Sequence, residues 1–195
     1  MIYLSLVFED ELSENVMDRI INAFHNKFEI AERYSGHGFG YLKSNIRGFN
    51  QASRVSPHFM LTDLDNYSCP LDLINNWVNF TFNPNFIFRV AVREVESWLL
   101  ADIEGLSDFF KVSRAIFPAN PDQLPDPKNT LIQLAKRSRK RKIRDEVVPI
   151  PHASIGPNYN GCLAEFVSVH WNIRNAMARS ESLKRTYLKL EKFNS

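Results

Sequence analysis

Residues 58–65 read HFMLTDLD, a strongly apolar run that ends in two aspartates, Asp63 and Asp65. Uninterrupted apolar runs of this length are typical of strands that are buried on both faces of a parallel sheet. In an open α/β sheet, the residues that follow such strands gather at one edge, where ligands bind. We therefore expect both aspartates at a functional edge, with Leu64 between them pointing into the core.

Two other apolar runs are also followed by acidic residues. YLSLVF ends at Glu9, and FIFRVAV is followed within a few residues by Glu96. Amphipathic stretches separate the runs, which predicts an α/β fold with a mainly parallel sheet flanked by helices. Beyond about residue 102 the pattern becomes helical. We expect a metal-binding core at residues 1–112 and a helical C-terminal extension at residues 113–195.

Local signals place several elements. Strands are predicted over residues 2–8, 58–62 and 86–92, and Ser13 is predicted to cap the first helix. The turn GPNYN at 156–160 either contacts substrate or supplies Asn160 as a helix cap. The glycines of GHGFG, at 36–40, permit a tight turn, and His37 between them is a candidate for proton transfer or phosphate contact.

Carboxylates gathered at one edge repel each other unless a cation lies between them. The three acidic clusters therefore predict a divalent cation bound by Glu9, Asp63 and Asp65, with Glu14 or Glu96 near a second cation. Each cluster also has a simpler interpretation. Residues 63–65 could form a turn that caps the following helix, and Glu9 could place a favourable charge at a helix N-terminus. Glu96 could form a surface ion pair with Arg93.

The basic residues are unevenly distributed. The net charge is +2, yet the stretch KRSRKRKIR at 136–144 carries seven of the 24 basic residues, so the remainder is at +2 − 7, or −5. Clustered Lys and Arg neutralise phosphates without reading sequence, which predicts nucleic-acid binding, with a solvated surface as the alternative. The residues concerned are Lys136, Arg137, Arg139, Lys140, Arg141, Lys142 and Arg144.

Lys128 lies just before this stretch. It follows Pro127, which is predicted to start a helix, so its ammonium group would project from the first turn towards a neighbouring phosphate. An ordinary solvated lysine is the alternative. We expect Lys128 to belong to the candidate catalytic residues.

The glutamate that closes the first strand, the Asp-x-Asp at 63–65 and the phrase VESWLL at 95–100 resemble the TOPRIM domain. This domain is the metal-binding module of topoisomerases, primases and the overcoming-lysogenization-defect nucleases. With DPK and GPNYN included, most of the chain is similar to small TOPRIM-like proteins of bacterial defence loci, which are often encoded beside an ABC-type ATPase. The chain departs from the usual motif at Asp10, where glycine is typical.

The resemblance implies a TOPRIM-like fold and Mg²⁺- or Mn²⁺-dependent cleavage of phosphodiester bonds in DNA or RNA. It implies catalytic roles for Glu9, Asp63, Asp65, Glu96 and Lys128, the lysine offsetting charge in the transition state. It also implies an effector subunit of an anti-phage system with an ATPase partner. The sequence leaves the choice of DNA or RNA and the oligomeric state open.

Two other functions match parts of the pattern. The main alternative is a non-catalytic regulatory or interaction module with a TOPRIM-like fold. Haloacid-dehalogenase-like phosphatases also place Asp-x-Asp after a strand and use the first aspartate as a phosphoryl acceptor. Their motif normally opens the chain, however, whereas Asp63 lies far from the N-terminus.

The chain has no pattern of a membrane or secreted protein. No apolar run approaches the roughly 20 residues that span a bilayer, and MIYLSLVFED lacks the basic start of a secretory signal. Cys69 and Cys162 are too few and too far apart for a disulfide framework or a zinc site. We therefore expect a cytoplasmic protein without a membrane partner.

Overall fold

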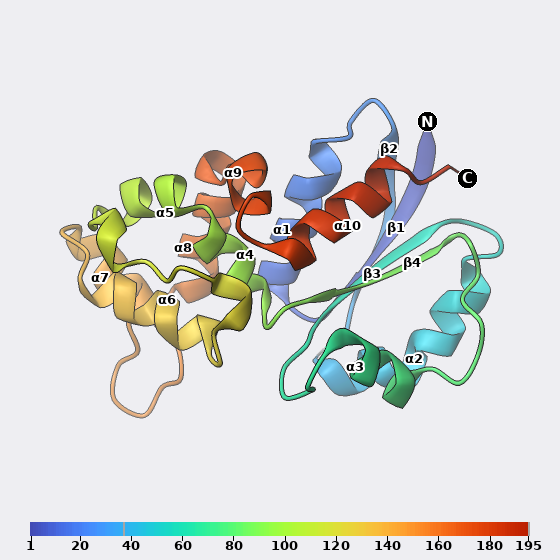
Figure 1. Cartoon of the computed structure of the whole chain (residues 1–195), viewed down its shortest axis with the longest axis horizontal. Coiled ribbons are helices and arrows are strands. Elements are labelled where there is room, and N and C mark those ends of the chain that lie inside the picture. The colour runs from blue at the N-terminus through green and yellow to red at the C-terminus, as the bar shows by residue number, and fades with distance from the viewer. Residues whose placement is uncertain (37, 195) are drawn as a thin grey trace. The chain divides into compact units, whose positions relative to one another are not determined.

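The computed structural model describes residues 1–36 and 38–194 (Figure 1). His37, the candidate histidine of the glycine-rich segment, lies outside these residues. The chain forms two compact units, Met1–Val92 with Arg185–Ser195, and Arg93–Lys184. The sequence favoured a division at residues 112 and 113, whereas the compact units divide between Val92 and Arg93. Helices α4 (Val95–Ala101) and α5 (Ile103–Phe110) pack with other helices of the second unit.

A four-stranded parallel sheet forms the centre of the first unit. Its order is β2-β1-β3-β4, and all three pairings are parallel. The buried apolar runs form β1 (Ile2–Phe8), β3 (His58–Asp63) and β4 (Phe86–Ala91), as predicted within one residue at their ends. The predicted class, α/β with a parallel sheet flanked by helices, is therefore confirmed.

The remaining strand, β2 (Phe28–Ser35), was not predicted. Its sequence FEIAERYS has no apolar run, and only Phe28 is buried. The strand lies at an edge of the sheet, next to β1. Edge strands commonly carry exposed charged side chains, which oppose pairing with other chains. The hydrophobic pattern that identifies central strands is consequently absent here.

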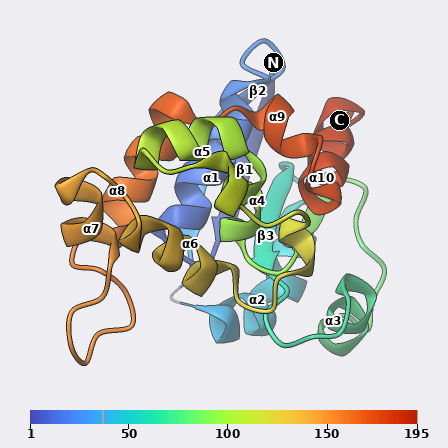
Figure 2. The same ribbon diagram turned by 60° about the vertical axis from the view of Figure 1, so that its left-hand side comes forward.

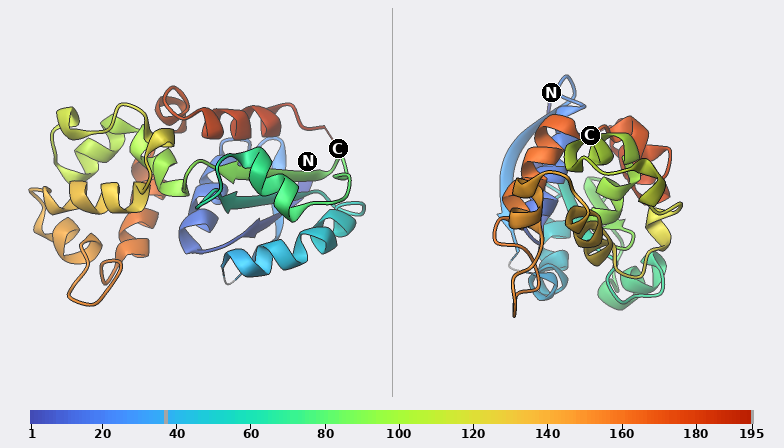
Figure 3. Two further views of the ribbon diagram at one scale, coloured as in Figure 1. Left: turned by 60° about the horizontal axis from the view of Figure 1, so that its bottom comes forward. Right: turned by 90° about the vertical axis from the view of Figure 1, so that its left-hand side faces the viewer.

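Helices cover both faces of the sheet in the first unit (Figures 1 and 3). On one face, Val7, Met60 and Phe88 of the strands pack with side chains of α2 (Phe39–Ala52) and α3 (Pro70–Trp77). On the other face lie α1 (Glu11–Asn22) and the last turns of α10 (Glu181–Glu191). Alternation of strand side chains between the faces supplies both layers with apolar contacts.

The first helix begins earlier than expected. Asp10, not Ser13, is its N-cap: the backbone at Asp10 is extended, and its side chain accepts a hydrogen bond of 2.8 Å from the Ser13 amide. The prediction for Ser13 was wrong because the helix follows the strand almost directly. The side chain of Asp10, where the TOPRIM motif has glycine, therefore has a structural role.

The second unit consists of helices (Figure 2). Residues 93–184 are all described, and they contain no strand, as the sequence predicted. Trp98 is completely buried, donates from Nε1 to Ser182 Oγ at 2.7 Å and accepts at its carbonyl from Trp171 Nε1 at 3.3 Å. Besides α4 and α5, the elements are η1 (Arg114–Ile116), η2 (Pro121–Gln123), α6 (Pro127–Lys136), α7 (Arg141–Val147), α8 (Tyr159–Glu165), the π-helix η3 (Phe166–His170) and α9 (Ile173–Met177).

The cap predicted at Asn160 is wrong. Helix α8 begins at Tyr159, so Asn160 lies within its first turn, and Asn158 occupies the N-cap position without a capping hydrogen bond from its side chain. Both cysteines are free thiols. Burial raises the pKa of Cys162 to about 12, which makes it an unreactive thiol at neutral pH. Among the described residues, no helix combines the length and apolarity needed to cross a membrane.

Burial predicts a large difference between two leucines of the first unit. Leu61 in β3 is completely buried, whereas Leu71 in α3 is 69% exposed. We expect Leu61→Ala to lower the free energy of unfolding by about 2–5 kcal/mol, because it leaves a cavity in the core. Leu71→Ala should change it by no more than about 0.5 kcal/mol. Urea titrations followed by circular dichroism measure both; equal effects would contradict the burial assigned to β3.

Candidate functional site

Glu9 joins the ends of the two central strands. It directly follows β1, and its Oε1 accepts hydrogen bonds from Thr62 Oγ1 and from the Asp63 amide, the latter at 3.2 Å. Thr62 and Asp63 are the last two residues of β3. Two of the predicted site residues, Glu9 and Asp63, therefore meet at the carboxyl edge of the sheet.

The pKa of Glu9 is raised above its ordinary value of 4.5. Desolvation by burial is the largest cause, and the negative charges of Asp65 and Asp10 act in the same direction. The hydrogen bonds from Thr62 and Asp63 oppose the shift by stabilising the ionised form. Glu9 is thus a half-buried carboxyl group with further carboxylates close enough to raise its pKa.

Asp65 reaches this edge through an unusual backbone conformation. Its φ angle is +48°, in the left-handed region that Asp adopts more readily than most residues. Leu64 before it is buried in the core, as predicted, and its amide donates to the Ala91 carbonyl of β4 at 2.9 Å. The chain therefore turns sharply after β3, with Asp63 and Asp65 both half-buried on either side of the anchored Leu64.

The carboxylate oxygens at this edge are suitable ligands for a hard divalent cation, but they do not form a complete coordination sphere. Within residues 1–36 and 38–194, no group of three or more His, Cys, Asp or Glu side chains is placed to hold a metal ion. Mg²⁺ is commonly held by one or two carboxylates, with substrate phosphates and water completing its coordination. Glu9 and Asp65, whose charges interact, fit such an incomplete site.

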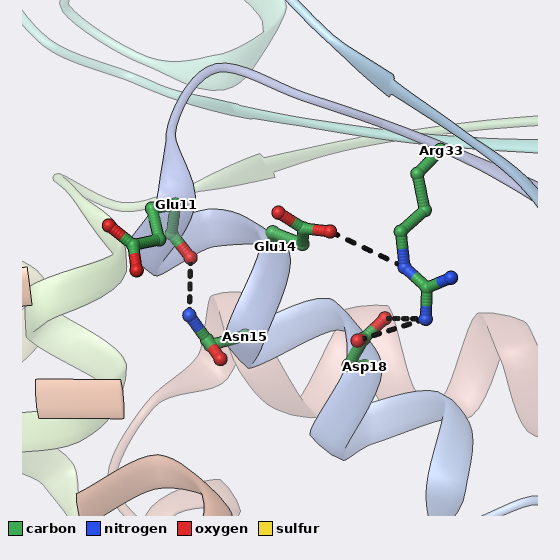
Figure 4. A network of polar contacts seen from close by, with 5 residues as sticks. All are labelled: Glu11, Glu14, Asn15, Asp18 and Arg33. Atoms are coloured by element: carbon green, nitrogen blue, oxygen red, sulfur yellow. Dashed lines mark hydrogen bonds and ion pairs between the residues drawn. The ribbon is translucent and has the colours of Figure 1, made fainter. Parts of the chain in front are cut away.

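Glu14, the predicted ligand of a second metal, has a cationic partner in the same unit. Figure 4 shows Arg33 of β2 between two carboxylates of α1, with Nε 3.4 Å from Glu14 and a terminal nitrogen 3.1 Å from Asp18. Burial and the charge of Asp18 raise the pKa of Glu14, and Arg33 lowers it. This ion pair favours a structural role for Glu14 over a role as a metal ligand.

A second group of ionisable residues surrounds Glu96 in the second unit. Glu96 is only 2% exposed, so the surface pair considered for it is wrong. Its Oε1 lies 3.6 Å from Lys128 Nζ and accepts a hydrogen bond of 2.9 Å from the Tyr159 hydroxyl. Burial raises the pKa of Glu96, and the positive charge of Lys128 is the main opposing cause. The structure thus brings together two predicted catalytic residues, Glu96 and Lys128.

The start of α6 positions Lys128. The helix begins at Pro127, as predicted, and Asp126 caps it by accepting from the Asn129 amide at 2.7 Å. The Lys128 amide donates to Glu94 Oε2 at 3.0 Å. Glu94 also contributes a negative charge that raises the pKa of Glu96.

Glu94 was not predicted as a site residue, and Tyr159 was considered only as part of a turn that either contacts substrate or caps a helix. Glu94 lies two residues before Glu96, a spacing that could have drawn attention to it. Tyr159 belongs to the GPNYN turn, whose contact with Glu96 depends on the fold. Glu9, Asp63 and Asp65 belong to the first unit, and Glu96 and Lys128 belong to the second.

The basic stretch spans the end of α6, a short loop and α7. Two of its charges are neutralised within the unit: Arg141 pairs with Asp145 at 3.2 Å, and Lys142 pairs with Glu165 at 3.1 Å. Arg144 keeps its charge and donates to the Ser138 carbonyl. The side chains of Lys136, Arg137 and Arg139 are exposed, and Lys140 lies over the ring of Phe109. The stretch is therefore a partly paired basic surface.

Comparisons with known proteins give a weak structural likeness. No family model matches the chain, and no curated protein matches it. A solved structure that resembles it is the C-terminal region of the Burkholderia pseudomallei OLD protein, with 16% sequence identity and a TM-score of 0.44. The similarity covers 94% of this chain and 98% of that chain. The assignment of fold class rests on the strand order and register of the chain itself.

The pairing of Glu96 with Lys128 predicts a pH-dependent loss of stability in Lys128→Met. Without the lysine, the folded-state pKa of Glu96 rises further above its ordinary value of 4.5. The folded state then binds more protons than the unfolded state between those two pKa values, so stability falls as pH rises through that range. We expect a loss of about 1–2 kcal/mol at pH 8, moderated by the exposure of Lys128, and a smaller loss at pH 5.

Urea unfolding at both pH values measures this effect. Lys136→Met is the matched control, because it removes an exposed lysine from the same helix, α6. Its effect should stay within about 0.5 kcal/mol at either pH. A loss in Lys128→Met that is independent of pH would contradict the assigned interaction with the buried carboxylate.

Proposed function

We propose that the chain is a Mg²⁺- or Mn²⁺-dependent nuclease that cleaves phosphodiester bonds. The observation that carries this proposal is Glu9: a carboxyl group with raised pKa, held between the ends of β1 and β3 and facing the charges of Asp65 and Asp10. Burying a carboxylate among like charges is unfavourable. A bound cation would relieve that repulsion, so the arrangement of carboxylates favours cation binding.

In this proposal, Glu9, Asp63 and Asp65 hold the cation, which supplies charge for polarising a phosphate oxygen and lowering the pKa of a bound water. Thr62 and the Asp63 amide orient the Glu9 carboxylate through its Oε1. Its second oxygen, Oε2, is the one we assign to the cation. Leu64, anchored in the core, keeps Asp63 and Asp65 at fixed positions after β3.

For the second unit, we propose that Lys128 contacts a phosphate of the substrate. Glu96 restrains the ammonium group from one side, and Tyr159 orients Glu96. Because the Lys128 side chain is 39% exposed, its ammonium group is accessible to a substrate. We propose Glu96 as a positioning residue for Lys128. The role of Glu96 near a second cation, which the sequence predicts, stays a prediction.

The basic surface supports a polyanionic substrate. Arg139 and Lys111 line an open polar pocket of about 370 Å³, together with the hydroxyl-bearing residues Ser107 and Ser113. Lysine, arginine and hydroxyl groups are the usual phosphate contacts of nucleic-acid-binding proteins. Asp108 also lines the pocket and would oppose an anion there. We therefore assign phosphate-backbone binding to the surface as a whole, with DNA and RNA both as candidate substrates.

Loss of the carboxylates should abolish cleavage. We expect Glu9→Gln and Asp65→Asn to lower the rate of Mn²⁺-dependent cleavage by about two orders of magnitude or more, the scale of a lost electrostatic contact to a transition state. Glu29→Gln, an exposed carboxylate on the edge strand β2, is the control and should keep the wild-type rate. Plasmid DNA and transfer RNA serve as substrates, and calorimetry measures cation binding.

The outcomes separate the candidate functions. Cleavage that disappears in both variants but not in the control supports the nuclease, and the substrate that is cut decides between DNA and RNA. Cation binding without cleavage would indicate that an activating partner is required. Absence of both in the wild type would favour the regulatory module.

The basic surface yields a separate prediction. Arg137→Ala with Arg139→Ala should weaken binding to any nucleic-acid sequence and reduce the slope of log K against log salt by about 2 if each arginine neutralises one phosphate. Lys142→Ala is the control, because Lys142 already pairs with Glu165. Fluorescence anisotropy over a series of salt concentrations measures the slopes. Equal slopes in the wild type and the double variant would contradict phosphate binding by this surface.

A non-catalytic module with the same fold is the second candidate. The observation in its favour is that residues 1–36 and 38–194 contain no complete three-ligand group for a metal. In either case we propose an ATPase partner and a role in anti-phage defence, on the basis of the sequence resemblance alone. Co-purification of the chain with the product of a neighbouring ATPase gene would test that partnership.

A further inference from the structure

The first unit has an aromatic pocket that the proposed chemistry does not use. It is an open pocket of about 280 Å³ beside α2, lined by Tyr34, Tyr41, Asn45, Gly48, Phe49, Ala52 and His58. This volume is at the lower end for ligand sites, so it suits a small ring system rather than an extended molecule. The pocket lies wholly within one unit and is built from β2, α2 and the start of β3.

Aromatic rings form much of the lining. Phe49 lies between two tyrosines, with ring centroids 5.5 Å from Tyr34 and 6.5 Å from Tyr41. Tyr34 stacks on His58 at 6.0 Å with only 17° between the ring planes. Both tyrosines remain about two-fifths exposed, at 38% and 42%, although Phe49 and His58 are buried. Ring surface is therefore available for stacking by a planar ligand.

Gly48 keeps the pocket open. Tyr41, Asn45, Gly48 and Ala52 follow one another at helical spacing along one side of α2. A Cβ atom added at Gly48 would meet nothing within 4 Å, so no close packing requires glycine there. Glycine within a helix costs roughly 0.5–1 kcal/mol relative to alanine. The space beside Gly48 is therefore open to a ligand.

Asn45 and His58 supply hydrogen-bond acceptors to the pocket, beside the hydroxyl groups of Tyr34 and Tyr41. The Asn45 amide nitrogen donates to the Tyr41 carbonyl at 2.9 Å, which leaves its Oδ1 to accept. His58 Nδ1 lies 2.7 Å from the Ser56 carbonyl and so carries the proton, which leaves Nε2 as an acceptor in the neutral ring. Acceptors beside stacked rings match the exocyclic amino and ring N–H groups of nucleobases.

We propose that this pocket binds an unpaired nucleobase of a single-stranded nucleic acid. Stacking on Tyr, Phe and His rings is the general way in which proteins hold such bases. The lining contains no Lys, Arg, Asp or Glu, so it suits a neutral base and offers no charged side chain to bind a phosphate. A free nucleotide would lack an anchor here, whereas a polynucleotide is held through its other phosphates.

The position of the pocket extends the proposed nuclease function, on which this inference rests. His58 and Asp63 are the first and last residues of β3, five residues apart or about 16 Å at the usual rise of a strand. A single strand with one phosphodiester at the carboxylate edge would therefore place a base several nucleotides away in the pocket. The pocket would select single-stranded over double-stranded substrates.

Filling the pocket from Gly48 tests this inference. Gly48→Leu places a side chain in the open space and improves helix propensity, so the fold should be retained. Gly40→Leu is the matched control: it lies in the same helix, its added Cβ also meets nothing within 4 Å, and it does not line the pocket. Circular dichroism and thermal melts verify folding of both variants.

Binding is measured by fluorescence anisotropy with labelled single strands of about 12 nucleotides, within the usual site size of such proteins. EDTA is present, so no strand is cleaved. We expect Gly48→Leu to weaken binding about tenfold, the scale of one lost stacked base, and Gly40→Leu to bind like the wild type. A strand in which base-free spacers replace nucleotides should bind the wild type about tenfold more weakly than the base-containing strand does. The wild type and Gly48→Leu should bind this spacer strand with equal affinity.

Tyr41→Ala provides a second measurement, because it removes an exposed ring without filling the pocket, and it should also weaken binding. Equal affinity of the wild type and Gly48→Leu for the base-containing strand would overturn the inference. Mononucleotides that bind as tightly as the strand would overturn it too, by making a free nucleotide the occupant. Because EDTA removes any need for catalysis, failure of the nuclease proposal in the cleavage assay is a separate result.

Discussion

The parallel pairing of β1 with β3 is the constraint on which the candidate metal edge depends. It brings the end of the first strand beside the end of the third, so Glu9 accepts hydrogen bonds from Thr62 and Asp63, more than 50 residues later in the chain. A parallel pair requires a crossover connection, and here the crossover contains α1, β2 and α2. The carboxylates therefore converge through a long-range contact that the crossover makes possible.

Both candidate sites contain a carboxyl group whose pKa is raised by burial, half-buried Glu9 in one and fully buried Glu96 in the other. Glu9 is stabilised by two hydrogen bonds and opposed by neighbouring acidic residues, whereas Glu96 has both a hydrogen bond and a lysine. The difference matters chemically, because an uncompensated carboxylate favours a cation and a compensated one orients its partner. Such groups lower stability, and natural proteins retain them where function requires them.

Two residues of the first unit have backbone features that lower stability. Gly48 weakens α2 without any packing reason, and Asp65 adopts a left-handed conformation that most residues avoid. Both lie in the first unit, where Leu64 and Phe49 anchor the adjacent chain in the core. A rigid sheet with apolar layers on both faces can accommodate these local costs.

The sequence by itself determined the central strands, the α/β class and the start of α6, because buried apolar runs and proline act locally. It did not reveal β2, whose edge position removes the hydrophobic pattern, nor the cap at Asp10, which depends on where the strand ends. It indicated Glu9, Asp63 and Asp65 by their position after strands. Only the tertiary structure decided that Arg33 neutralises Glu14, that Tyr159 contacts Glu96, and that Tyr34 and Tyr41 share a pocket, because these partners are brought together by long-range packing that no local pattern encodes.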